Sequence, residues 1–82
     1  MNQQTSILAY TDNVQEKARL RQLVYAVIMN DGPLSDAEIG FRLNVPRQTV
    51  APRRNELVRM GWVKKSGVGE FRGRTVNLWG MV

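Results

Sequence analysis

The sequence contains neither cysteine nor histidine. A chain without cysteine forms no disulfide, ligates no iron–sulfur cluster and lacks zinc sites of the finger or ribbon type. A chain without histidine also lacks the commonest general base and every serine–histidine or cysteine–histidine pair. The acidic residues are scattered along the chain and suggest no pair of carboxylates in one site. We therefore expect a protein that is not an enzyme and that binds no metal ion and no cofactor.

Long apolar segments are missing as well. The longest run, residues 23–29, is far shorter than the roughly 18 residues that a membrane span requires, and no segment has the pattern of a targeting signal. The chain has 82 residues, of which 43% are hydrophobic and 23% charged, so it has enough apolar material for one domain with a single core. We expect a cytoplasmic protein with no membrane partner.

Acidic residues are few in the second half of the chain. Residues 1–41 carry three basic and five acidic side chains, a net charge of −2, whereas residues 42–82 carry nine basic and two acidic ones, a net charge of +7. An imbalance of this size favours contact with a polyanion, either nucleic acid or an anionic membrane surface. The alternative is a solvated basic face that only keeps the protein in solution.

Helical periodicity is clear over residues 14–29, where one apolar stripe is formed by Leu20, Leu23, Val24, Val27 and Ile28. Asp12 or Asn13 can cap the start of this helix. Its end is predicted at residues 30–33, with Gly32 in the left-handed conformation. Residues 1–11 are polar apart from Ile7, Leu8 and Tyr10. We expect them to form a separate N-terminal arm that is frayed or packs on a neighbour.

A second, short helix has a complete start signal. Ser35 and Glu38 have the spacing of a capping box, and Leu34 and Ile39 the spacing of the hydrophobic staple that accompanies it. The helix is predicted to stop after about two turns, at residues 44–46, where the sequence is Asn-Val-Pro.

A third helix is predicted from Arg47 or Thr49 to Met60, closed by Gly61. Pro52 helps to locate the first residue of this helix, because proline is tolerated in the first turn of a helix but bends a helix when it lies in the interior. We favour the start at Thr49, or a bent first turn.

After Gly61 the pattern becomes that of a β-hairpin. Residues 62–66 and 74–79 are rich in β-branched and aromatic side chains, and residues 67–73 between them contain three glycines, which predicts a turn. Val63, facing Val76 and Leu78, is expected on the buried side. The glycines do not form a phosphate-binding loop, because the required Lys and the following helix are missing.

The order of three helices and a hairpin is that of a winged helix-turn-helix domain. In such a domain the third helix enters the major groove of DNA and the preceding helix holds it across the backbone. Gly40 is the small residue at the crossing of the two helices, and Asn44 can adopt the left-handed turn. Ile39, Leu43, Val45 and Val50 form the shared apolar wedge. A plain αα-hairpin could have the same spacing, but the hairpin that follows in a basic half favours the winged form.

Residues 34–39, 49–57 and 59–63 resemble the small winged helix-turn-helix DNA-binding proteins of bacteria and their phages, and residues 73–79 are similar to the end of the wing in phage-type members. The resemblance covers about residues 14–80. It implies a mainly α fold with a C-terminal β-hairpin, a DNA-binding domain over residues 12–80, and a place in the bacterial cytoplasm, or in the host cytoplasm if the protein is encoded by a phage.

The resemblance also implies a set of DNA-binding residues. Arg47, Gln48, Thr49 and Arg53 would lie on the DNA-facing side of the recognition helix, and Arg72 and Arg74 on the wing. Lys64 is also included among the predicted DNA-binding residues, because strand alternation places it and Lys65 on opposite faces of the hairpin. Arg54 departs from the family pattern, which has an apolar residue there, and either extends past the core edge or pairs with an acid such as Glu38.

Each of these residues has a simpler alternative role. The residues at 47–49 could only cap the helix, and Arg53 could pair with Glu56 at i+3. Trp62 and Trp79 are expected to cover the core rather than to stack on bases. Phe71, near the tip of the wing, could act as a wedge or pack on a partner.

These observations predict a sequence-specific double-stranded DNA-binding protein that regulates transcription. The recognition helix, about residues 47–60, would enter the major groove, and the wing, about residues 62–79, would contact the adjacent backbone. A homodimer through the first helix and residues 1–11 would bind paired half-sites. The alternative is a winged-helix module that docks on a replication, packaging or transcription protein.

Overall fold

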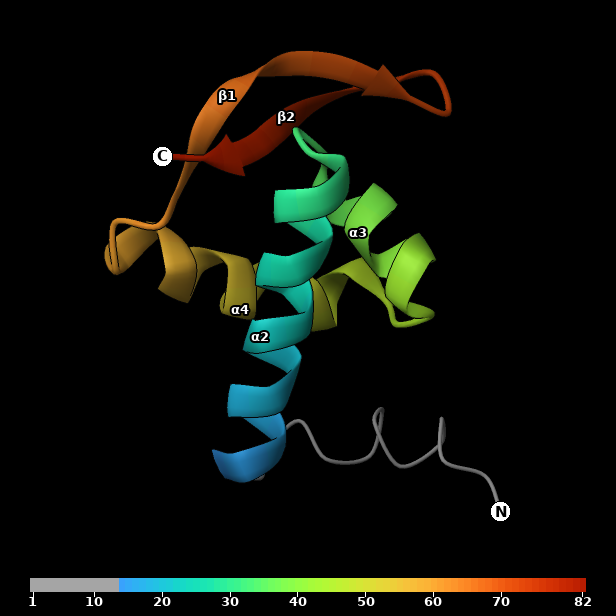
Figure 1. Cartoon of the computed structure of the whole chain (residues 1–82). Coiled ribbons are helices and arrows are strands. Elements are labelled where there is room, and N and C mark those ends of the chain that lie inside the picture. The colour runs from blue at the N-terminus through green and yellow to red at the C-terminus, as the bar shows by residue number, and fades with distance from the viewer. Residues whose placement is uncertain (1–13) are drawn as a thin grey trace.

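The computed structural model describes residues 14–82. Helices α2 (Val14–Asp31), α3 (Asp36–Leu43) and α4 (Arg47–Arg59) are followed by strands β1 (Val63–Phe71) and β2 (Arg74–Met81). In Figure 1 the two strands lie across one end of the three helices, with the turn of the hairpin on the side of α3. The expected mainly helical architecture with a C-terminal hairpin is confirmed. The caps expected at residues 12–13 and the arm over residues 1–11 lie outside the described residues.

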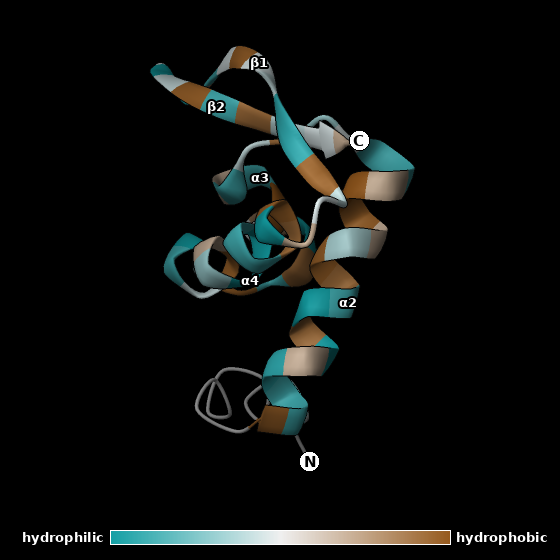
Figure 2. Ribbon diagram, turned by 90° about the vertical axis from the view of Figure 1, so that its left-hand side faces the viewer, coloured by the Kyte–Doolittle hydropathy of each residue, from teal (hydrophilic) through white to brown (hydrophobic). Residues whose placement is uncertain are grey.

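One core joins the helices to the base of the hairpin. Its fully buried apolar side chains are Leu20, Val24, Ile28, Leu34, Ile39, Val45, Val50, Leu57 and Val63. Leu23 and Val27, expected on the same stripe of α2, are only half-buried. Figure 2 shows hydrophobic positions of α2 on the side toward α3 and α4. In the part of the chain that the structure describes, no helix is long and apolar enough to cross a membrane.

Gly32 ends α2 for a different reason from the expected one. Its φ is not positive, so the prediction of a left-handed residue is wrong. The Gly32 amide donates to the Ile28 carbonyl at 2.8 Å. A Cβ at this position would lie 2.5 Å from the same carbonyl oxygen, well inside van der Waals contact. Glycine is therefore required by close packing against the last turn of the helix.

The start of α3 confirms the capping box. The Ser35 hydroxyl accepts from the Glu38 amide at 3.1 Å, and the Glu38 carboxylate accepts from the Ser35 amide at 2.9 Å. Leu34 and Ile39, the two residues of the predicted staple, are both buried. This reciprocal pairing satisfies two amides that the helix itself leaves without partners.

The turn between α3 and α4 also has the predicted form. Asn44 is left-handed, with φ 62° and ψ 42°. A Cβ on Gly40 would lie 2.5 Å from the Val45 carbonyl oxygen, so only glycine fits where the turn crosses α3. Val45 and Val50 are buried against Ile39, which confirms the apolar wedge.

Helix α4 begins at Arg47, so the favoured start at Thr49 is wrong. Pro46 is the N-cap, and its carbonyl accepts from the amides of Thr49 at 2.9 Å and Val50 at 3.3 Å. Pro52 is consequently the sixth residue of the helix and lies on its exposed side. A proline there leaves the Gln48 carbonyl without its helical donor, at a cost of about 3 kcal/mol. Burial of Val50 and Leu57 on the inner side of α4 offsets this cost.

The hairpin is longer and tighter than predicted. Only Arg72 and Gly73 connect the strands, so the glycine-rich turn over residues 67–73 is wrong. Gly67 and Gly69 lie within β1 opposite Leu78 and Val76, and a Cβ on Gly69 would lie 3.1 Å from the Leu78 side chain. Gly69 makes room for the Leu78 side chain, whereas Gly67 has a φ of 152° and follows the register shift after Lys65. Composition alone does not distinguish these roles from that of a turn.

The base of the hairpin has a register that the sequence did not indicate. Val63 pairs with Met81 instead of facing Val76 and Leu78, and the register shifts between Lys65 and Gly67. Leu34 extends the sheet by a single bridge, with amide-to-carbonyl distances to Trp79 of 3.0 and 2.8 Å in the two directions. The α2–α3 connection is thereby attached to β2.

Candidate nucleic-acid interface

Ion pairs neutralise part of the positive charge of residues 42–82. Arg42 pairs with Asp31 at 2.8 Å, Arg53 with Glu56 at 2.8 Å and Arg54 with Asp36 at 2.7 Å. Glu56 also binds Arg21 of α2 at 3.0 Å. Six exposed basic side chains of this half have no acidic partner within the described residues, namely Arg47, Arg59, Lys64, Lys65, Arg72 and Arg74. The basic half thus keeps a smaller set of cations for a partner than its net charge indicates.

Arg53 does not lie on the exposed face of α4. Its side chain is only 10% exposed, and its Nη2 donates to Glu56. The expectation of an exposed Arg53 is wrong because position 53 is three residues after Val50 and four before Leu57, which places it on the inner face of the helix. The alternative pairing with Glu56 is the one found. Its Nε is buried and has no hydrogen-bond partner among the described residues.

Arg54 is a structural arginine. Its Nε and Nη2 donate to the two carboxylate oxygens of Asp36 at 2.9 and 2.7 Å. Its guanidinium also lies 3.9 Å from the centre of the Trp79 ring. The expected partner, Glu38, is occupied by the capping box. Arg54 therefore joins α4 to the start of α3 and to β2, and Asp36 neutralises its charge.

The exposed face of α4 is uncharged except at its two ends. Gln48, Pro52, Asn55 and Arg59 are exposed at a spacing of i, i+4, i+7 and i+11, which is one side of a helix. Arg47 is exposed at the start, and Thr49 is half-buried. Arg47 and Gln48 are therefore the predicted contact residues of the first turn that lie fully at the surface.

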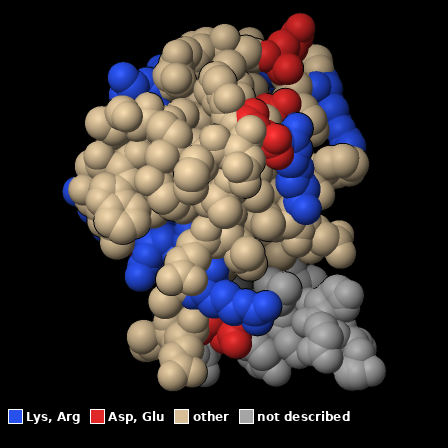
Figure 3. Space-filling view, in the orientation of Figure 1, with Lys and Arg blue, Asp and Glu red and all other residues tan. Residues whose placement is uncertain are grey.

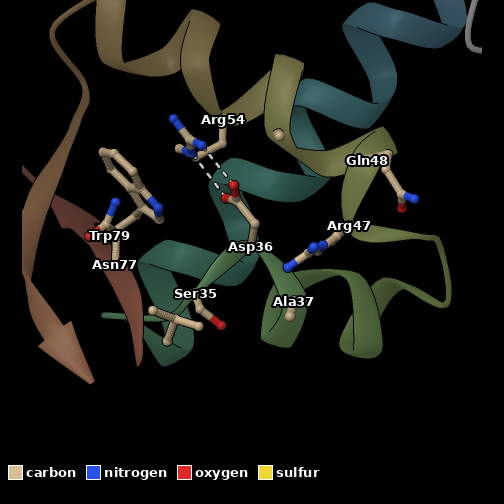
Figure 4. A pocket seen from close by; sticks show the side chains of 10 residues that line it. Ser35, Asp36, Ala37, Arg47, Gln48, Arg54, Asn77 and Trp79 are labelled. Atoms are coloured by element: carbon tan, nitrogen blue, oxygen red, sulfur yellow. Dashed lines mark hydrogen bonds and ion pairs between the residues drawn. The ribbon is translucent and has the colours of Figure 1, made fainter. Parts of the chain in front are cut away.

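A hollow separates the first turn of α4 from β2 (Figure 4). It is lined by Ser35, Asp36, Ala37, Arg47, Gln48, Ala51, Arg54, Val76, Asn77 and Trp79. Asp36 and Arg54 face each other in it and neutralise each other, so Arg47 is the lining residue with an uncompensated charge. Arg47, Gln48 and Asn77 are exposed polar residues of this lining. Asn77 lies here because of the pairing of the strands, and no motif in the sequence indicated a role for it.

The turn of the hairpin approaches the same end of α4. Arg72 and Gly73 both have positive φ, 54° and 79°, the backbone of a tight two-residue hairpin turn. A second hollow is lined by Ala37, Phe41, Arg47, Phe71 and Arg72. Arg47 thus lines both the hollow that contains Gln48 and the hollow that contains Arg72 of the turn. The structure brings together Arg47, Gln48 and Arg72, and Arg74 pairs with Phe71 beside them.

Lys64 lies apart from this group. It is exposed and pairs with Gly80 near the open end of the hairpin, seven residues from Phe71 along β1. At about 3.3 Å per residue the separation is on the order of 20 Å. Lys and Arg side chains are likewise spread over separate parts of the face in Figure 3, with uncharged surface between them.

The aromatic residues divide in a way that the sequence did not indicate. Trp79 is half-buried against the core, as expected. Trp62 is 52% exposed and contacts Tyr25 in a tilted arrangement, with ring centres 5.2 Å and ring planes 51° apart, so the expectation that it covers the core is wrong. Phe41, for which the sequence suggested no role, is 73% exposed.

A comparison with protein-family models gave no match, and searches of curated proteins and of solved structures gave none either. Within residues 14–82 no cluster of three or more acidic, histidine or cysteine side chains could hold a metal ion.

Proposed function

We propose that the protein is a non-enzymatic, sequence-specific double-stranded DNA-binding protein that regulates transcription. In this proposal α4 enters the major groove, which is wide enough for a helix, and the hairpin contacts the adjacent backbone as a wing. The observation that carries the proposal is the position of Arg47, which lines one hollow with Gln48 and another with Arg72. A helix start and a hairpin tip with unpaired arginines on one side of the molecule suit a groove and its flanking phosphates.

The residues of this surface have separate roles in the proposal. Gln48 reads a base edge, because glutamine pairs with adenine in the major groove, and Arg47 contacts a phosphate beside the start of the helix. Arg72 and Arg74 contact phosphates, which position the protein without reading sequence. Thr49, half-buried, supports the first turn of α4. Lys64 adds a backbone contact at the far end of the wing. Arg53 has no role at the DNA, because it is held by Glu56.

Selection of bound sequences from a random duplex pool tests the proposal. We expect an enriched motif and a binding constant that falls with salt, with a logarithmic slope of about −0.9 per phosphate contacted. Arg47→Ala should weaken binding to the selected site. Arg19→Ala is the matched control, because Arg19 is an exposed arginine on α2, outside this surface. An unenriched pool or a flat salt dependence contradicts the proposal.

A second candidate function is a module that docks on a replication, packaging or transcription protein. What favours it is a groove between α2 and the end of α4, lined by Ala18, Arg21, Gln22, Tyr25, Leu57, Met60 and Trp62. Met60 and Trp62 are 45% and 52% exposed there. A homodimer through α2 and residues 1–11 could use the same side of the molecule.

Trp62→Ala distinguishes the two candidates. A DNA-binding regulator keeps its affinity for the selected duplex when this side chain is removed. A docking module instead loses affinity for its protein partner. Measurement of the mass in solution at high concentration tests the dimer, and a monomer there contradicts it.

A further inference from the structure

No packing contact with the core explains why the Phe41 side chain is exposed. It is the most exposed of the aromatic side chains that the structure describes, at 73%. It lies on α3, two residues after the buried Ile39, and it is not one of the residues that form or pack against the core. Its ring forms one wall of the hollow between α3 and the tip of the wing. An exposed aromatic ring in a hollow is a candidate surface for a ligand with a flat apolar face.

Arg72 is held in this hollow at a backbone conformation that disfavours it. The first residue of such a turn is favoured as Asn, Asp or Gly, because a side chain at positive φ is strained. The Arg72 guanidinium lies 5.3 Å from the centre of the Phe71 ring and 6.0 Å from that of Phe41. These contacts keep the cation beside the aromatic rings. Strain of this kind is an indication of function when the residue also faces a surface hollow.

The hollow is positively charged. Two of its lining residues, Arg47 and Arg72, are arginines without an acidic partner among the described residues, and none of its lining residues is acidic. The nearest lining carboxylate in the neighbouring hollow, that of Asp36, is neutralised by Arg54. The site therefore combines an apolar ring with two cations.

We propose that this hollow binds one unpaired nucleotide, whose base stacks on Phe41 and whose phosphate is held by Arg47 and Arg72. Aromatic rings beside arginines are the usual means of holding single-stranded nucleic acid, because every base has a flat face and every nucleotide a negative charge. A paired base stays in the duplex stack and does not reach the ring. The inference rests on the proposed binding of DNA and adds a preference for duplexes that contain an unpaired nucleotide.

The test measures affinity for three short duplexes that differ at one position. One is fully paired, one has a single-nucleotide bulge, and one has an abasic bulge, which keeps the phosphate and lacks the base. We expect the bulge with a base to bind from about fivefold to about a hundredfold more tightly than the abasic bulge, the range that base stacking on an aromatic ring produces.

Two substitutions of Phe41 assign the preference to this hollow. Phe41→Leu keeps an apolar side chain but removes the ring, and we expect it to abolish the difference between the two bulges. Phe41→Trp restores a larger ring and should keep or increase the difference. Both variants should bind the fully paired duplex as the wild type does. Because the side chain is exposed, neither should change the midpoint of urea unfolding by much, which verifies the fold.

Four outcomes overturn the inference. If the wild type binds the two bulges with equal affinity, the inference is overturned. The proposed function is unaffected by that result as long as the paired duplex binds. A preference that persists in Phe41→Leu places the base elsewhere and also overturns it. A preference that Phe41→Trp loses shows that stacking does not cause it. Absence of binding to all three duplexes and to the random pool overturns both proposals.

Discussion

The guanidinium of Arg54 lies 3.9 Å from the centre of the Trp79 ring, and its other contacts are two hydrogen bonds to Asp36. Trp79 is also bridged to Leu34 through the backbone. The three elements that meet here are the start of α3, the middle of α4 and strand β2. Their mutual orientation decides how far the turn of the hairpin stands from the first turn of α4.

The Arg54–Asp36 pair should contribute to stability as a coupled unit. The side chains are 14% and 19% exposed, so the pair is shielded from water. In a double-mutant cycle of Arg54→Met and Asp36→Asn, we expect a coupling free energy of about 1–2 kcal/mol in urea unfolding, since both hydrogen bonds are charge-assisted. Strictly additive single-mutant effects would mean that the two groups do not interact in solution.

Gly40 should tolerate no side chain. Gly40→Ala places a Cβ 2.5 Å from the Val45 carbonyl oxygen and forces α3 and the turn apart. We expect a loss of about 1–3 kcal/mol in the free energy of unfolding, as for other overpacked sites.

The control for Gly40→Ala is Gly61→Asn. Gly61 has a positive φ of 83° but nothing within 4 Å of a Cβ, and asparagine accepts that conformation better than most residues. Gly61→Asn should therefore cost less than Gly40→Ala. A larger loss at Gly61 would mean that backbone conformation, and not the contact with Val45, dominates.

We expect Arg72 to lower the free energy of unfolding and to strengthen DNA binding. Arg72→Asn puts a residue suited to positive φ at the turn, and we expect it to stabilise the fold by about 0.5–1 kcal/mol. The same change removes a cation from the proposed interface and should weaken DNA binding. Thermal unfolding and a DNA titration measure the two effects. A variant that is less stable would show that the contacts with the two phenyl rings outweigh the strain.

Arg47 and Arg53 should differ in the salt dependence of DNA binding, although they lie on one helix. Arg47→Ala removes an exposed cation that we place on a phosphate, so the logarithmic salt slope should become shallower by about 0.9. Arg53→Met should leave both affinity and slope unchanged, because Arg53 is buried and Glu56 keeps Arg21 as a partner. A shallower slope in Arg53→Met would contradict this assignment.

Sequence reasoning succeeded where the interactions are local. The capping box at Ser35 and Glu38 and the left-handed Asn44 depend on residues at most a few positions apart, so their spacing predicts their geometry. The stripe of α2 and the order of the elements follow from periodicity in the same way. The prediction of a glycine-rich turn failed because Gly67 and Gly69 lie within β1, where they pair with Leu78 and Val76 of β2.

The order of three helices and a hairpin, the caps and turn of α3, and the charge difference between the halves can all be read from the sequence, because each depends on composition or on neighbours within about one helical turn. Which arginines are held in ion pairs depends on how the chain folds. Arg53 lies on the inner face of α4 and pairs with Glu56, and Arg54 pairs with Asp36, 18 residues away, so neither is left exposed. Folding also brings Arg47 to Arg72 and leaves Phe41 exposed beside them. Packing between distant segments, and not local preference, sets the register of the hairpin and hence which charges remain unpaired.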